Sequence, residues 1–142
     1  MKNGYEHILK QAALAREEGR LSDAEKAYLE ILREKPDSGS VLNALGTVFL
    51  DQAKPDQAKK LFEKAANLTP PNLSACYNLG RLKQMEGDHN GAINIYRAIV
   101  EQQPRFGLAW NNMGVAYREI GEPEEAISCF RRAVAFAPEL AE

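Results

Sequence analysis

The sequence predicts an all-α protein in which one helix–turn–helix repeat occurs four times in succession. The first observation is a fixed interval, because marker residues recur every 34 residues along the chain. The markers are a proline (Pro36, Pro70, Pro104, Pro138), an alanine (Ala24, Ala58, Ala92, Ala126), an aromatic residue (Tyr28, Phe62, Tyr96, Phe130) and a glycine (Gly46, Gly80, Gly114). A period of this length is typical of stacked copies of one supersecondary element.

The second observation is the spacing of apolar residues inside each repeat. Leu42, Leu45 and Phe49 follow one another at i, i+3 and i+7, which places them on one face of a helix. Ala58 and Phe62 begin a second stripe of the same kind, and equivalent stripes occur in the other repeats. Because helix-stopping segments separate the two stripes, each repeat is predicted to be a pair of helices joined by a short turn.

The repeats are predicted to form a single domain over residues 1–142 and to span residues 5–38, 39–72, 73–106 and 107–140. In the first repeat, Ser22 and Glu25 have the spacing of a capping box that starts the second helix. In the second and fourth repeats, Pro55 and Pro123 suit the first turn of a helix, where a missing N–H has no cost. In the third repeat the turn begins at Gly87. The period proline is predicted to end each second helix.

Composition and charge exclude several classes of protein. The 142-residue chain is 44% hydrophobic and 27% charged, and 18 basic against 20 acidic residues leave a net charge of -2. This balance leaves no excess of basic residues that would attract nucleic acid or an anionic membrane. No apolar run approaches the ~20 residues that span a bilayer, and the first residues lack the apolar core of a signal peptide. We therefore expect a cytoplasmic protein.

The sequence contains no arrangement that indicates catalysis, a metal site or a cofactor. Cys76 and Cys129 fall at period positions that are apolar in the other repeats, so both are expected to be buried, unpaired thiols. His89, one of two histidines, lies in a predicted solvated turn. No nucleophile elbow, phosphate-binding loop or zinc-hydrolase motif is present. We expect a protein that is not an enzyme and has neither a metal nor a cofactor.

The repeated residues closely resemble the tetratricopeptide repeat family over about residues 5–140. The fourth repeat is nearest the family pattern, with Trp110, Met113, Gly114, Tyr117, Gly121, Ala126, Phe130, Ala133 and Pro138. Two repeats depart from it. The first has Ala12 and Ala15 where later repeats carry glycine and a larger residue, and the third has Lys83 at an aromatic position. The resemblance implies a right-handed superhelical α-solenoid of four antiparallel helix pairs, whose first helices line a concave groove.

The resemblance also implies that this groove binds a peptide segment of a partner protein. By period, the groove residues are Asn43, Thr47, Tyr77, Asn78, Arg81, Gln84, Asn111, Asn112 and Arg118. An asparagine amide both donates and accepts, so Asn78 and Asn112 can hold a peptide backbone at successive repeats. Arg81 and Arg118 would favour acidic side chains, and Tyr77 would offer an apolar or stacking surface. We therefore predict a non-catalytic protein–protein interaction module, or scaffold.

Two other functions are open at this point. The last predicted helix presents apolar residues that a fifth repeat would normally help to cover, namely Ile127, Phe130, Val134 and Phe136. An uncapped face of this kind predicts self-association through the C-terminal end, or a chain cut from a longer protein. Similar arrays also precede catalytic domains, such as glycosyltransferases of the O-linked N-acetylglucosamine type. By that analogy, this chain would be a substrate-presenting arm of an enzyme.

Overall fold

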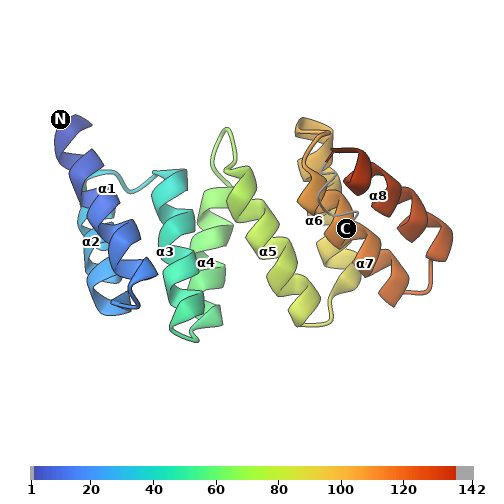
Figure 1. Ribbon diagram of the computed structural model, residues 1–142, viewed down its shortest axis with the longest axis horizontal. Helices are drawn as coiled ribbons and strands as arrows, with labels where there is room; N and C mark the ends of the chain where they lie inside the picture. The colour runs from blue at the N-terminus through green and yellow to red at the C-terminus, as the bar shows by residue number, and fades with distance from the viewer. Residues whose placement is uncertain (1, 137–142) are drawn as a thin grey trace. The chain divides into compact units, whose positions relative to one another are not determined.

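The computed structural model describes residues 2–136 as eight α-helices joined by short turns, with no strand in that range (Figure 1). The helices are α1 (Lys2–Glu17), α2 (Leu21–Glu34), α3 (Gly39–Asp51), α4 (Pro55–Ala66), α5 (Leu73–Met85), α6 (His89–Gln102), α7 (Gly107–Glu119) and α8 (Pro123–Phe136). They follow one another as four helix–turn–helix pairs, which confirms the all-α class. Pro138, the last period proline, lies outside the described residues.

The chain forms two compact halves, each with its own buried core. The N-terminal half is Met1–Ala75 and the C-terminal half is Cys76–Glu142. The largest fully buried side chains of the N-terminal half are Ile31, Leu42, Leu45, Val48 and Phe62. Those of the C-terminal half are Tyr96 and Ile99. None of the helices described in residues 2–136 combines the length and the apolar composition of a membrane span.

In three helix pairs an aromatic ring lies directly against the backbone of a glycine. A Cβ atom built on Gly46 would lie 2.4 Å from Phe62 Cε1, and one built on Gly80 would lie 2.6 Å from Tyr96 Cε1. Gly114 has the same relation to the aromatic residue of its own repeat. Because real Cβ atoms do not approach a ring this closely, the glycine permits the two helices of a pair to come together.

The turns inside the pairs close through residues that are again one period apart, at positions 19, 53, 87 and 121. Gly19, Gly87 and Gly121 have φ angles of 80°, 85° and 82°, and Ala53 has a φ of 61°. In the second turn, the N–H that follows Ala53 donates to the carbonyl of Phe49 at 2.8 Å, which satisfies a free carbonyl at the helix end. Ala53 thus occupies a left-handed position that its counterparts fill with glycine.

The predicted capping box of Ser22 and Glu25 is wrong. The helix α2 begins at Leu21, and Arg20 occupies the N-cap without a side-chain capping hydrogen bond. Ser22 therefore lies within the first turn of the helix, beyond the position where its hydroxyl would cap. Arg20 instead forms an ion pair with Asp23 at 3.3 Å.

Other local predictions have mixed outcomes. Pro55 and Pro123 are the first residues of α4 and α8, as predicted. Cys129 is buried and Cys76 half-buried, and both thiols are free. The solvated turn predicted for His89 is wrong, because this residue begins α6 and is half-buried. Its Nδ1 atom is buried and has no hydrogen-bond partner among the described residues.

Replacing Ala53 with glycine should raise the free energy of unfolding by up to about 1 kcal/mol. The left-handed backbone costs a residue with a Cβ atom about 1–2 kcal/mol, and the greater freedom of glycine in the unfolded chain offsets about half of that. Urea unfolding followed by far-UV circular dichroism measures the change. Ala13→Gly, at an exposed position inside α1, is the control and should lower stability by up to about 1 kcal/mol. Equal losses in both variants would contradict the strain at Ala53.

Candidate functional site

The C-terminal half contains a polar and aromatic cluster in which Tyr77 is held from several sides. The Tyr77 hydroxyl accepts a hydrogen bond from Asn112 Nδ2 at 3.0 Å. Its ring centroid lies 6.0 Å from that of Tyr96 and 5.7 Å from that of Phe106. Tyr77 on α5 is therefore fixed by α6, by α7 and by the residue that precedes α7.

Gln84 joins the same three helices through its side-chain amide. Its Oε1 atom accepts a hydrogen bond from the Tyr96 hydroxyl at 2.5 Å. Its Nε2 atom donates to the backbone carbonyl of Asn112 at 3.2 Å. A buried tyrosine hydroxyl thus has a partner, and that partner is tied in turn to α7.

Arg81 adds a positive charge to the cluster. Tyr77, Arg81 and Gln84 lie at i, i+4 and i+7, so they share one face of α5. The guanidinium carbon of Arg81 lies 5.9 Å from the centroid of the Tyr77 ring, within the range of a cation–π contact. The arginine is exposed, so its charge is available to a ligand. We call Tyr77, Arg81, Gln84, Tyr96, Phe106 and Asn112 the Tyr77 cluster.

Burial controls the protonation of the Tyr96 hydroxyl. Removal from water raises the pKa of Tyr96 well above its ordinary value of 10.0, and the Asn112 amide acts in the opposite direction. Tyr96 is therefore neutral at physiological pH, because desolvation disfavours the phenolate. A neutral hydroxyl can donate to Gln84, as the structure shows.

Four of the predicted groove residues meet in the Tyr77 cluster, namely Tyr77, Arg81, Gln84 and Asn112. The others in this half lie on the same helices, with Asn78 and Asn111 half-buried and Arg118 exposed near the end of α7. The amide nitrogen of Asn112 donates to Tyr77. This side chain therefore positions an aromatic ring, a role that the sequence pattern did not suggest.

Asn43 and Thr47 belong to α3 in the N-terminal half, where both are half-buried. The hydroxyl of Thr47 donates to the carbonyl of Ala44 at 2.6 Å, one turn back in its own helix. That bond already uses the only hydrogen-bond donor of the threonine side chain.

The residues predicted for self-association on α8 are not equally available. Ile127 and Val134 are 50% and 41% exposed. Phe130 is half-buried, because its ring lies against the backbone of Gly114. The ring of Phe136 is also half-buried, and the guanidinium carbon of Arg105 lies 5.4 Å from its centroid.

The sequence interpretation missed Tyr96 and Phe106 as parts of the site. The sequence pattern indicates Tyr96 only as an aromatic marker of the 34-residue period, which says nothing about its hydroxyl. A signal was present, since the same position holds phenylalanine in the second repeat, at Phe62. A second position changes together with this one. The third repeat, which has Tyr96, carries the amide Gln84, and the second repeat, which has Phe62, carries the aliphatic Leu50 at the equivalent position.

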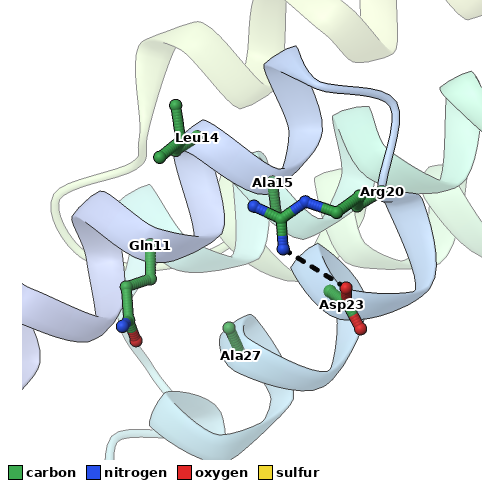
Figure 2. A pocket seen from close by; sticks show the side chains of 6 residues that line it. All are labelled: Gln11, Leu14, Ala15, Arg20, Asp23 and Ala27. Carbon is green, nitrogen blue, oxygen red and sulfur yellow. Dashed lines mark hydrogen bonds and ion pairs between the residues drawn. The ribbon is translucent and has the colours of Figure 1, made fainter.

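A hollow of about 340 Å³ lies between α1 and α2 in the N-terminal half (Figure 2). It is lined by Gln11, Leu14, Ala15, Arg20, Asp23 and Ala27. The dashed contact in Figure 2 joins Arg20 to Asp23, so the one cation of this hollow is paired with its one carboxylate. Within the described residues, no group of three histidine, cysteine or acidic side chains is placed to hold a metal ion.

Comparison with known protein families agrees with the repeated pattern. Three family models, each described as tetratricopeptide repeat, match residues 9–72, 73–106 and 107–140. Together they cover the chain from α1 to beyond the end of α8.

Relatives of known sequence are much longer than this chain. The BBSome complex member bbs-4 of Caenorhabditis elegans is 28% identical over 125 residues, which cover 88% of this chain and 27% of that protein. The human protein O-mannosyl-transferase TMTC3 is 31% identical over 107 residues, which cover 74% of this chain and 12% of that protein. The chain thus spans about a quarter or less of these relatives.

Solved structures show the same fold. MamA superposes with a TM-score of 0.82 at 24% identity, over 99% of this chain and 82% of that one. YrrB, described as a TPR protein with an unusual peptide-binding site, gives a TM-score of 0.74 at 24% identity, over 89% of this chain and 66% of that one. At these identities the likeness concerns the fold.

Removing both partners of the Gln84–Tyr96 pair should destabilise the protein less than the sum of the two single removals. Tyr96→Phe leaves Gln84 Oε1 without its donor, and Gln84→Leu leaves the Tyr96 hydroxyl without its acceptor, so each should cost about 1–2 kcal/mol. The double variant recreates the Leu50 and Phe62 combination of the second repeat. Its loss should be smaller than the sum of the single losses by about 1 kcal/mol, as measured by chemical denaturation. Strictly additive losses would show that the pair is not coupled.

The stability of the protein should fall as the pH rises above about 10. The pKa of Tyr96 is higher in the folded protein than its ordinary value of 10.0, so the folded state retains a proton that the unfolded state releases. Its contribution is complete below pH 10 and declines at higher pH. Unfolding titrations at several alkaline pH values should give a shallower decline for Tyr96→Phe than for the natural sequence. An unchanged slope would place the responsible groups elsewhere.

Proposed function

Because this chain belongs to the tetratricopeptide repeat family, we propose that it is a non-catalytic protein-interaction module that binds an extended segment of a partner protein. We place the binding site on α5 and α7, around the Tyr77 cluster. The observation that supports this most strongly is the fixation of Tyr77 by Asn112 and by two aromatic rings. We further propose that the repeats span residues 5–38, 39–72, 73–106 and 107–140.

A fixed tyrosine is well suited to peptide binding. Tyrosine provides a large contact area with only two side-chain torsions, so little conformational entropy is lost when a ligand orders it. In the Tyr77 cluster that ordering precedes binding, because Asn112 and Phe106 already hold the ring. Preorganisation of this kind raises affinity by lowering the entropic cost of association.

The polar residues around the ring indicate the chemistry of the ligand. Arg81 and Arg118 are both exposed and would favour acidic side chains in the bound segment. Asn78 and Asn111 offer amide groups, which can bond to a peptide backbone of any sequence. A partner segment with acidic residues and an apolar residue opposite Tyr77 fits this arrangement.

Asn43 and Thr47 are the corresponding positions of α3 in the N-terminal half, and we propose them as peptide contacts there. Peptide binding is consistent with the description of YrrB as having a peptide-binding site and of bbs-4 as a member of a complex. The identity of a partner would depend on the complete protein, since the chain covers about a quarter of bbs-4.

The two free thiols are compatible with a cytoplasmic location, which we also propose.

Self-assembly through α8 and service as an arm of a transferase have less support. Two of the four residues proposed for self-assembly, Phe130 and Phe136, are engaged by neighbours in the same chain. The match to TMTC3, a transferase by name, covers only 12% of that protein. The Tyr77 cluster, by contrast, is complete within the described residues.

Charge reversal at Arg81 should weaken peptide binding selectively. Peptides selected from a random displayed library on the purified chain should be enriched in aspartate and glutamate. Their affinity for Arg81→Glu, measured by fluorescence polarisation, should fall at least about tenfold, because one charge-assisted contact becomes a repulsion. Arg131→Glu on α8, an exposed arginine outside the cluster, is the matched control and should bind within about twofold of the natural chain.

Asn112→Ala should also weaken the same peptides, since it releases the Tyr77 hydroxyl. If the selected peptides bind Arg81→Glu and Asn112→Ala as tightly as the natural chain, the site on α5 and α7 is wrong.

A further inference from the structure

Apart from the Tyr77 cluster, the C-terminal half has a concave site between α6, α7 and α8. It is a cleft of about 220 Å³, and its lining includes Arg97, Trp110, Tyr117, Glu125, Cys129 and Arg132. Trp110 and Tyr117 lie seven residues apart on one face of α7. Asn111 and Arg118, which belong to the site proposed above, each lie one residue further along and point to another face. We call this second site the Trp110 cleft.

Each of the two cations in the cleft is held against an aromatic side chain. The guanidinium carbon of Arg132 lies 4.8 Å from the Trp110 ring centroid. Arg97 donates from Nη2 to the Tyr117 hydroxyl at 2.8 Å. Both arginines are exposed, and among the described residues neither has a carboxylate at ion-pair distance. A guanidinium has five N–H donors, so most of these donors have no partner in the described part of the chain.

The charged side chains of the cleft all shift the pKa of one group, the thiol of Cys129. Burial raises the pKa of this thiol, Arg132 and Arg97 act to lower it, and Glu125 acts to raise it further. Two cations and one carboxylate therefore surround the same small space. Because the thiol stays neutral, it supplies no counter-ion to the two arginines.

We propose that the Trp110 cleft binds the carboxylate side chain of a glutamate or aspartate in an acidic segment of a partner protein. The volume supports a single side chain, since small-molecule sites usually enclose about 300–1,000 Å³ and one water occupies about 30 Å³. Arg97 and Arg132 donate to the carboxylate, and the rings of Trp110 and Tyr117 contact its methylene groups. Glu125 opposes binding by repulsion.

This second site is independent of the proposed function of α5 and α7, because it uses a different face of α7 and different arginines. It would let one chain hold two acidic segments, or two parts of one segment. The simpler alternative is that Arg132 only covers Trp110 and binds nothing, and the experiment separates the two.

The single tryptophan of the chain provides the readout. Its indole Nε1 donates to the carbonyl of Pro104 at 2.7 Å, so its proton–nitrogen resonance should be sharp and well separated. The probe is a pentapeptide blocked at both ends, with one central glutamate between alanines, titrated into isotope-labelled protein. Its glutamine counterpart is the neutral control, and inorganic phosphate is the control for a free anion.

The glutamate peptide should shift the Trp110 indole resonance in a saturable way at millimolar concentration, and the glutamine peptide should not. Arg132→Ala should weaken this binding at least fivefold. Arg131→Ala removes the same charge from the same helix but lies outside the cleft, and should change the affinity less than twofold. Glu125→Gln should strengthen binding about threefold, a gain that a misfolded variant cannot produce.

Three outcomes would overturn the proposal. The first is the absence of any shift with the glutamate peptide, which would leave Arg132 as a cover for Trp110. The second is an equal loss in Arg131→Ala and Arg132→Ala, which would show only general attraction to positive charge. The third is a shift with phosphate but not with the peptide. None of these outcomes depends on Arg81, so the function proposed for α5 and α7 would be unaffected.

Discussion

The structure depends on one repeated contact, in which a large aromatic side chain packs against a residue that has little or no side chain. Phe62 and Tyr96 are fully buried, and each lies against a glycine of the other helix in its pair. Fully burying a side chain of this size contributes about 1.5–3 kcal/mol of transfer free energy. In the first repeat Ala12, which is also fully buried, stands at the glycine position. The close approach of two helices and the burial of the ring therefore require each other.

The candidate site is a consequence of that contact. When the aromatic residue is tyrosine, the core receives a hydroxyl that must find a partner. Gln84 accepts a hydrogen bond from the Tyr96 hydroxyl and donates one to the α7 backbone. The buried hydroxyl therefore determines which side chain stands at position 84, next to the candidate site. Tyr77 lies beside the Tyr96 ring and is fixed by it together with Asn112 and Phe106. The side chains that can meet a ligand are thus supported by the same packing that holds the helix pairs together.

The sequence predicted the repeated framework well because that framework is set by steric requirements that recur every 34 residues. Glycine at position 80 and proline at position 55 each have one dominant structural reason, and both were found where expected. Of the groove residues that the period and the family resemblance indicated, Arg81, Gln84 and Asn112 lie around Tyr77. Their role in binding stays a prediction.

Other features of the structure, such as helix starts and side-chain directions, are decided by local energies that the period does not determine. The start of α2 is set by Arg20 and not by Ser22, since several backbone positions can begin a helix at similar cost. The direction of the Asn112 amide and the position of Arg132 over Trp110 depend on side-chain torsions and on neighbours from other helices. Ala53 adopts its left-handed angle because the turn requires it, against the preference of the residue.

The pairing of helices that are adjacent in sequence also affects the folding rate of the chain. Within each half, the strongest contacts join a helix to the next one along the chain, so the segments that must close are short. Short closures lose little chain entropy, and proteins dominated by such local contacts fold rapidly. A helix pair can therefore form early and serve as the surface on which the next helix condenses. Within each half, local opening of one helix pair is governed by its own interface and by its contact with the neighbouring pair, so amide hydrogen exchange would differ between the pairs.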